Sequence, residues 1–181
     1  MNKALKRATL RAVKGSGVLG LTRDSKWRTQ RLVILCYHGI SLEDEHLWRP
    51  ILYVGQSVLQ QRLEILKRGN YSVLSLPEAV ELLYAKALPP RSVAITFDDG
   101  TYDFYAQAYP LLKSYGFPVT VYQSTYYTDY QRPVFNLACS YMLWKKRGAV
   151  IDCGQELGLR PPLDLRTEDS RQAIVRALAL P

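Results

Sequence analysis

An apolar run that ends on two adjacent carboxylates constrains the fold of this 181-residue sequence more than any other feature. Residues 93–97 read Val-Ala-Ile-Thr-Phe, which is typical of a buried β-strand, and Asp98, Asp99 and Gly100 follow at once. Neighbouring carboxylates repel each other, and a divalent cation or a shared proton relieves that repulsion. Because catalytic residues of α/β barrels lie at the carboxyl ends of strands, we expect a functional site here, with a solvated Asp-Gly turn as the alternative.

Strand and helix patterns alternate on both sides of this run, and a hydrophobic content of 48% suffices for a core. We expect Ser57 to cap a helix over 57–68 and Gly69 to end it. We expect Pro110 to interrupt a helix over 103–115. The predicted strands are residues 31–37 (buried), 71–74, 93–97 and 119–123, and the predicted helices are residues 57–68, 77–86 and 103–115. Such alternation indicates an α/β fold with parallel strands and right-handed helical crossovers.

Four short motifs carry a family resemblance. They are Tyr37-His38-Gly39-Ile40, Ser75-Leu76-Pro77-Glu78-Ala79, Thr96-Phe97-Asp98-Asp99-Gly100 and Tyr115-Gly116-Phe117-Pro118-Val119-Thr120. In order and spacing, residues 31–125 resemble the polysaccharide deacetylase family, also described as the chitooligosaccharide deacetylase-like domain. The resemblance implies a (β/α) barrel and a hydrolase that removes N-acetyl or O-acetyl groups from a polysaccharide or oligosaccharide substrate. It also implies a divalent metal, usually zinc.

The resemblance assigns different roles to the two acids. In the family the first Asp is the general base, and the second binds the metal together with two His from a later His-x-x-x-His motif. By position, Asp98 resembles the base and Asp99 the metal ligand. Further residues that the resemblance places near the site or the substrate are Tyr37, His38, Gly100, Ser124 and Thr125. A hydrogen-bonded structural role is the alternative for His38, and helix capping is the alternative for Ser124 and Thr125.

The sequence departs from the family pattern at the metal ligands. Its two histidines, His38 and His46, both precede the acids, and no His-x-x-x-His motif follows. A catalytic zinc ion has three protein ligands, so the ligand set is incomplete in this chain. The last residues, 178–181, lie within an apolar periodic segment, which predicts a truncated product that is weakly active or inactive.

Two other functions stay open. A degenerate, non-catalytic relative would still bind carbohydrate. A haloacid-dehalogenase-type phosphatase is a more distant alternative, because it needs carboxylates two positions apart, whereas position 100 is Gly.

The net charge of +8 is concentrated at one end of the chain. Residues 1–31 carry nine Lys or Arg and one Asp, so the remainder is neutral and no nucleic-acid partner is expected. Residues 1–30 form an expected basic amphipathic arm that binds an anionic membrane surface or, alternatively, lies as a solvated helix on the domain. No secretory signal or membrane span is predicted. Three cysteines without a disulfide or zinc spacing favour a reducing, cytoplasmic location, including the inner face of the membrane.

Residues 126–181 fit the core pattern poorly. We expect a loop at 129–133, a helix over 134–147, and a terminal helix that Thr167 caps and that reaches about Leu180. The predicted organisation is therefore an arm (1–30), a deacetylase-type β/α core (31–125), and a helical insertion with an incomplete C-terminal part (126–181). The predicted barrel is partial because it stops before the His-x-x-x-His motif.

Overall fold

The computed structural model describes residues 3–16, 31–152 and 154–179, and its centre is a four-stranded parallel sheet. Strand β5 (Ser92–Phe97) pairs with β1 (Val33–Tyr37) along one edge, from Val33 opposite Val93 to Tyr37 opposite Phe97. On its other edge, the first half of β5 pairs with β4 (Ser72–Leu74) and its end pairs with β6 (Thr120–Val121). This arrangement fits the α/β fold expected from the sequence, whereas closure into a partial barrel stays a prediction.

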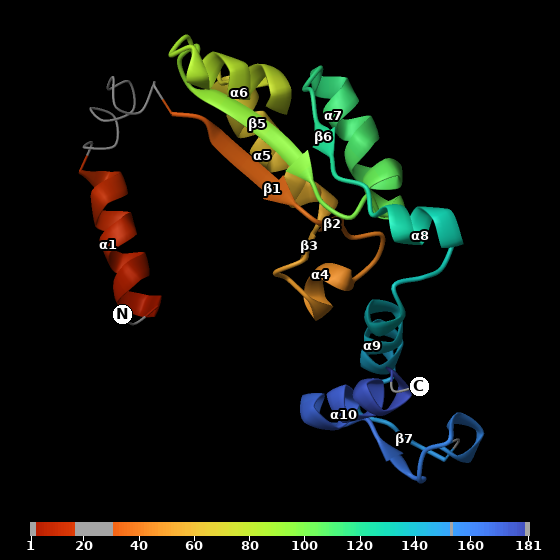
Figure 1. Cartoon of the computed structure of the whole chain (residues 1–181). Coiled ribbons are helices and arrows are strands. Elements are labelled where there is room, and N and C mark those ends of the chain that lie inside the picture. Colours follow the sequence, from red (N-terminus) through yellow and green to blue (C-terminus); the bar gives the residue numbers. More distant parts are fainter. Residues whose placement is uncertain (1–2, 17–30, 153, 180–181) are drawn as a thin grey trace.

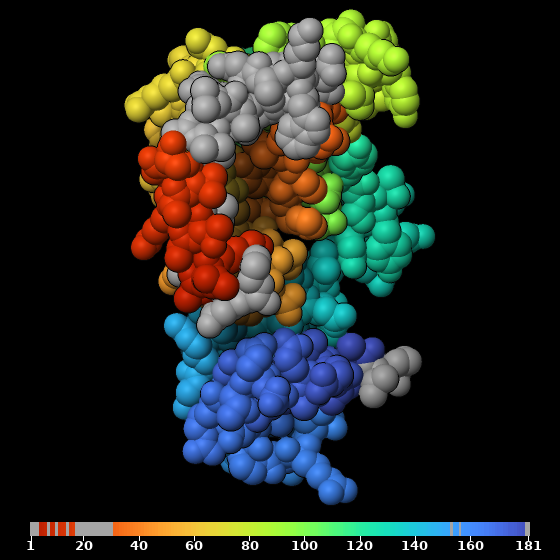
Figure 2. All heavy atoms as spheres, turned by 90° about the vertical axis from the view of Figure 1, so that its left-hand side faces the viewer, coloured from red at the N-terminus to blue at the C-terminus, as the bar shows by residue number. Residues whose placement is uncertain are grey.

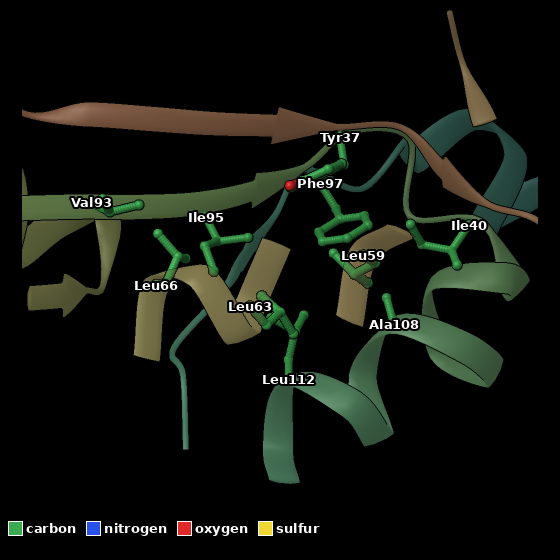
Figure 3. Close-up of a cluster of buried hydrophobic side chains, with 10 residues drawn as sticks. All are labelled: Tyr37, Ile40, Leu59, Leu63, Leu66, Val93, Ile95, Phe97, Ala108 and Leu112. Atoms are coloured by element: carbon green, nitrogen blue, oxygen red, sulfur yellow. The ribbon is translucent and has the colours of Figure 1, made fainter. Parts of the chain in front are cut away.

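Helices pack against one face of this sheet and bury the core between the two layers (Figures 1 and 3). They are α5 (Gln56–Arg68), α6 (Leu76–Tyr84) and α7 (Tyr109–Tyr115). Because side chains alternate along a strand, every second residue of β5 faces the helices. The buried cluster includes Tyr37, Leu59, Leu63, Leu66, Val93, Ile95, Phe97 and Leu112. Burial of both faces of β5 fixes the strand that carries the two acids.

The predicted core helices are present, with shifted ends. Helix α5 begins at Gln56 with Gly55 as its N-cap residue, so the expectation that Ser57 caps it is wrong. Gly69 ends α5 as expected. Residues 103–115 form a π-helix (Phe104–Ala108) followed directly by α7, and Pro110 lies in the first turn of α7. The π-helix pattern ends there because Pro110 has no N–H group with which to continue it.

The first strand is shorter and more exposed than its apolar sequence predicts. Val33 and Ile34 are 46% and 50% exposed, so the expectation of a fully buried strand over 31–37 is wrong. The reason is that β1 is an edge strand among the described residues, with β5 as its one neighbour in the sheet. Figure 2 shows the orange atoms of this segment at the molecular surface.

Two very short strands follow β1 in the chain and are not predicted from the sequence. Strand β2 (Gly39–Ile40) pairs in parallel with β3 (Tyr53–Val54), and helix α4 (Glu45–Trp48) lies between them. Two residues are too few for a periodic pattern. His46 lies half-buried in α4 with a ring nitrogen 3.0 Å from the Ser41 hydroxyl, and not on the exposed loop that the sequence suggests.

The last third of the chain is mainly helical and lies beyond the carboxyl end of the sheet (Figure 1). Helix α9 (Phe135–Lys145) matches the helix predicted there. The strand expected over 119–123 is shorter, with β6 at Thr120–Val121, and α8 (Thr125–Tyr130) extends into the expected loop at 129–133. The terminal helix α10 (Glu168–Ala179) has the predicted cap, because the Ser170 amide donates a hydrogen bond of 3.1 Å to the Thr167 hydroxyl.

The remaining C-terminal elements form a small apolar cluster of their own. A hairpin of β7 (Val150–Ile151) and β8 (Leu163–Asp164) encloses a single 3-10 turn over Gln155–Leu157. Leu163 and Leu165 of this hairpin region pack with Ile174 of α10. The cluster gives this region a core distinct from the one beneath the sheet.

The basic arm is helical, as its spacing predicts. Helix α1 (Lys3–Gly15) contains no acidic residue, and each of its side chains whose burial is described is exposed. The rest of the predicted arm, residues 17–30, lies outside the described residues. Among those that are described, no helix combines the length and apolarity needed to cross a membrane.

Candidate functional site

The two acids lie on a tight turn at the carboxyl end of β5. The Asp98 amide donates a hydrogen bond of 2.9 Å to the Tyr37 carbonyl, so the ladder with β1 continues for one residue past the strand. Asp99 and Gly100 then adopt left-handed backbone conformations, with φ of +69° and +61°. The Gly100 amide donates to the Asp98 carbonyl at 2.9 Å and closes the turn. The left-handed turn therefore takes Asp99 out of the regular alternation of the strand.

The Asp98 side chain lies beside Cys36, which belongs to β1, and beside His38, which directly follows β1. The Cys36 thiol donates a hydrogen bond of 3.3 Å to Asp98 Oδ2, and His38 Nε2 lies 3.6 Å from the same oxygen. The Tyr37 ring is buried in the core and stacks on Phe97. Because side chains alternate along a strand, Cys36 and His38 on either side of Tyr37 project from the opposite face of the sheet. Since Tyr37 pairs with Phe97, the next residue of each segment brings His38 beside Asp98.

The Cys36 thiol has a raised pKa. A side-chain hydrogen bond with Thr96 is the largest influence and favours the thiolate. Partial burial, the hydrogen bond to Asp98 and the negative charge of Asp98 act in the opposite direction and together outweigh it. The Asp98 carboxylate is therefore held beside a protonated thiol and an imidazole.

Asp99 lines a cavity of about 570 Å³. The lining includes Asp99, Gly100, Tyr102, Gln123, Tyr127, Thr128 and Arg132. The cavity thus combines aromatic rings, amide and hydroxyl groups, a guanidinium and one carboxylate. Such a lining suits a polar ligand with a flat face.

Gly100 has no side chain, and Gln123 of the cavity wall occupies the space where one would lie. A Cβ atom at position 100 would approach Gln123 Oε1 to 1.9 Å. Gln123 is itself oriented, because its Nε2 donates a hydrogen bond of 2.8 Å to the Thr128 hydroxyl. A side chain at position 100 would therefore be strained by the left-handed φ and would have to displace Gln123.

A second cavity, of about 440 Å³, lies next to the first and shares Tyr102 with it. Its lining includes Trp48, Tyr53, Asp103 and Tyr141. Asp103 is buried, and its Oδ2 accepts a hydrogen bond of 2.6 Å from the Ile40 amide. Burial, followed by the Asp103 charge, raises the pKa of Tyr53 to about 12. Sequence reasoning treats Asp103 only as the start of a helix, because its acceptor role depends on a loop more than 60 residues away.

The other predicted site residues take different places. Tyr37 is a core residue that reaches the acids through its carbonyl and not through its ring. Ser124 is the N-cap residue of α8 without a side-chain cap hydrogen bond, and Thr125 begins that helix. Neither Ser124 nor Thr125 lines the cavity beside Asp99.

Comparison with known proteins finds a family model that matches the segment carrying this site. Residues 85–158, which include both acids and Gly100, match the family model described as polysaccharide deacetylase. The resemblance to polysaccharide deacetylases is confirmed. Among solved structures, a deacetylase of Streptococcus pyogenes, PplD in complex with acetate, superposes with a TM-score of 0.50 at 24% identity, over 81% of this chain and 80% of that one. That likeness shows the fold.

Curated relatives carry related names. The chain is 28% identical over 99 residues to the poly-β-1,6-N-acetyl-D-glucosamine N-deacetylase of Escherichia coli K12, covering 54% of this chain and 14% of that protein. It is 36% identical over 93 residues to YxkH of Bacillus subtilis, a putative polysaccharide deacetylase by name, covering 51% of this chain and 31% of that protein. The chain thus spans less than a third of the length of these two relatives.

The zinc site predicted around Asp99 does not fit the donors that this chain offers. Asp99 belongs to no group of three potential metal ligands among the described residues, and the sequence has no His-x-x-x-His motif. One group does appear in the described part of the chain, and it consists of Cys36, His38 and Asp98. Asp98, predicted as the base, is therefore the acid that lies beside other donors.

Proposed function

We propose that this chain is part of a hydrolase that removes N-acetyl groups from a glucosamine-containing polysaccharide, with O-acetyl groups as the alternative target. The observation that carries the proposal is the acid pair at the carboxyl end of β5, inside the segment that matches the family model and beside a cavity. The curated relatives are deacetylases by name, which supports the reaction class. The parallel sheet with an open edge at β1 supports a partial barrel.

Asp98 is assigned as the general base. Its side chain is 35% exposed, so solvent water reaches the carboxylate, while the main-chain bond to Tyr37 fixes its position. In the reaction, this carboxylate takes a proton from the attacking water as the oxygen adds to the acyl carbon. Breaking the carbon–nitrogen bond then releases acetate, and the leaving amine needs a proton from an acid.

The cavity beside Asp99 is the proposed place of the sugar. Tyr102 and Tyr127 offer aromatic faces for a pyranose ring, and Gln123 and Arg132 offer hydrogen-bond donors for hydroxyl and acyl oxygens. A volume of about 570 Å³ lies in the usual range for small-ligand sites and accommodates at least one sugar unit. Asp99, at its wall, is the proposed acidic contact to the reacting group.

Metal dependence is part of the proposal, but the family's metal site is incomplete here. In the family pattern the ligands that would join Asp99 are the two His of a His-x-x-x-His motif, and these 181 residues contain no such motif. We therefore expect the isolated chain to be a weakly active or inactive fragment. A non-catalytic carbohydrate-binding protein is the second candidate, favoured by the presence of the cavity without a complete ligand set.

Two measurements on the 181-residue chain separate these candidates. The proposal predicts that the chain binds an N-acetylglucosamine oligomer, releases little acetate alone, and releases acetate when the reading frame includes a downstream His-x-x-x-His segment. Binding without acetate release by the complete gene product would favour the carbohydrate-binding alternative. Phosphatase activity with magnesium would support the haloacid-dehalogenase alternative, although position 100 holds Gly where that class needs a second carboxylate.

Helix α1 is the proposed contact to an anionic membrane surface, at the cytoplasmic side. Its five Lys and Arg residues without an acidic neighbour support this proposal, because each basic group near an anionic surface adds about 1 kcal/mol. Cell fractionation tests the location, since recovery from outside the cytoplasm would contradict it.

A further inference from the structure

We propose that Cys36, His38 and Asp98 form a transition-metal site of their own, for which Zn²⁺ is the best-suited ion. The three side chains supply one thiol sulfur, one imidazole nitrogen and one carboxylate oxygen, all within 4.8 Å of one another. The group differs from the one that the family resemblance predicts, because it uses Asp98 in place of Asp99 and includes a cysteine.

The two distances from Asp98 to the other donor atoms are close to those of a tetrahedral zinc ion. Bonds of about 2.0 Å to nitrogen and oxygen and about 2.3 Å to sulfur, at the tetrahedral angle, separate the donors by roughly 3.3–3.5 Å. The sulfur of Cys36 lies 3.3 Å from Asp98 Oδ2, and His38 Nε2 lies 3.6 Å from that oxygen. Small side-chain rotations therefore suffice to bind an ion between the three.

The backbone holds these donors in place before any ion arrives. Cys36 belongs to β1, and His38 and Asp98 directly follow paired strands. The Asp98 amide bonds to the Tyr37 carbonyl, and beneath them the rings of Tyr37 and Phe97 stack at 5.2 Å in the core. Binding an ion therefore has to order only three side chains, because the backbone that carries them is already fixed by strand pairing. This lowers the entropic cost of the site.

The donor types select the ion. A thiolate is a soft ligand, whereas Mg²⁺ and Ca²⁺ bind oxygen ligands, so this mixed set favours zinc over both. Three protein ligands leave one position of a tetrahedral ion for water. Entry from solvent is open, since the side chains of His38 and Asp98 are 42% and 35% exposed and Cys36 is exposed.

This site does not depend on the proposed deacetylase activity. An Asp98 carboxylate that binds an ion is no longer free to accept a proton from water, so the two uses of Asp98 exclude each other. An ion bound at Cys36, His38 and Asp98 would therefore block the base, and the two uses are distinguished because cobalt titration of the 181-residue chain detects the ion without any acetate release.

Cobalt titration of the reduced, metal-free 181-residue chain tests the proposal, because a cysteine thiolate bound to Co²⁺ gives a near-ultraviolet charge-transfer band. We expect one equivalent of Co²⁺ to produce the band and excess Zn²⁺ to remove it. The Cys36→Ser variant should lose the band, and His38→Gln and Asp98→Asn should each weaken Co²⁺ binding by on the order of 10-fold or more. The matched controls Cys139→Ser and Cys153→Ser should keep it.

A band that persists in Cys36→Ser, or one that disappears in Cys139→Ser or Cys153→Ser, would overturn the proposal. So would metal binding that Asp99→Asn abolishes while Asp98→Asn leaves it intact. Circular dichroism checks that each variant is folded. X-ray absorption of the zinc-loaded unaltered chain gives an answer that needs no variant: one sulfur neighbour is expected, and a shell of nitrogen and oxygen alone would refute the site.

Discussion

At the scale of single residues, the site depends on positions where one particular residue is required. Gly100 and Asp103 are two of them, and they support different sides of the turn that follows the acids. Gly100 leaves space for Gln123, and Asp103 holds the loop after β1 through the Ile40 amide. Each requirement can be measured separately.

Replacing Gly100 by Ala should destabilise the chain by about 2–4 kcal/mol. The left-handed backbone alone costs an alanine about 1–2 kcal/mol, and displacement of Gln123 adds to that. The control is Gly116→Ala, because Gly116 has a similar φ of +66° and no atom within 4 Å of the added Cβ. Urea unfolding measures both losses. Equal losses in the two variants would show that Gln123 moves aside without cost.

Replacing Asp103 by Ala should cost about 1–3 kcal/mol of stability. The change leaves the buried Ile40 amide without its acceptor, and an unpaired buried donor carries that penalty. Asp103→Asn is the matched control, since its amide oxygen can still accept the bond and the loss should be smaller. Thermal unfolding of the two variants provides the comparison, and equal midpoints would contradict the assigned role of this hydrogen bond.

At the scale of elements, the end of the C-terminal hairpin carries an exposed ion pair between Asp164 and Arg166 that depends on pH. The Arg166 side chain and amide donate hydrogen bonds to Asp164, which lowers the pKa of that carboxyl to about 2. Because the folded pKa is lowered, the stabilisation is present above the ordinary value near 3.8 and is lost as the pH falls to about 2.

Carboxyl-carbon NMR titration measures this pKa directly. The account predicts that Asp164 titrates near 2 and that Arg166→Gln raises its pKa toward 3.8. The exposed pair Arg68 and Glu64 offers a control, because Arg68→Gln should leave Asp164 unchanged. A titration of Asp164 near 3.8 in the unaltered chain would contradict the ion pair in solution.

Helix α1 is an element whose role is open to a simple binding test. If it contacts anionic membranes, the intact chain should co-sediment with phosphatidylserine vesicles more than a chain that lacks residues 1–16. The difference should shrink at high salt, because salt screens the attraction. Equal sedimentation of the two chains would remove the membrane proposal and leave α1 as a solvated helix.

The elements that sequence reasoning finds are those with enough residues to show a pattern. The apolar run of β5 and the helical spacing of α5 predict those elements to within a residue or two. Strands of two residues, such as β2 and β7, carry no such pattern and form only because partners are brought to them by tertiary packing. The exposure of β1 depends likewise on its lack of a second strand neighbour among the described residues, which its own apolar sequence does not reveal.

The acid pair after the strand could be predicted, with His38 near the site by resemblance, but the contact of Asp98 with Cys36 could not. Cys36 and His38 are two residues apart, which places them on one face of a strand and is a usable signal. Their closeness to Asp98 depends on the register of β1 against β5, and a single-residue slip would send both to the other face. The cavity beside Asp99 likewise needs α8 and the segment after it, which come from distant parts of the sequence.

At the scale of the whole molecule, the sheet formed by the described residues has an unpaired edge at β1. An exposed edge at β1 is where further strands of a barrel would pair, which is consistent with a chain that spans 14–31% of two curated relatives. Among the described residues, no group of three potential metal ligands includes Asp99. The site at the end of β5 is therefore best tested in the complete gene product.

Acetate release from a poly-β-1,6-N-acetylglucosamine oligomer by the complete gene product tests the central claim most directly. If the acids after β5 form the reaction site, Asp98→Asn should lower the rate by on the order of 100-fold or more, and Asp99→Asn should also abolish most activity. Asp129→Asn, at an exposed position of α8, should keep the unaltered rate. Unchanged acetate release in both Asp98→Asn and Asp99→Asn would contradict the account.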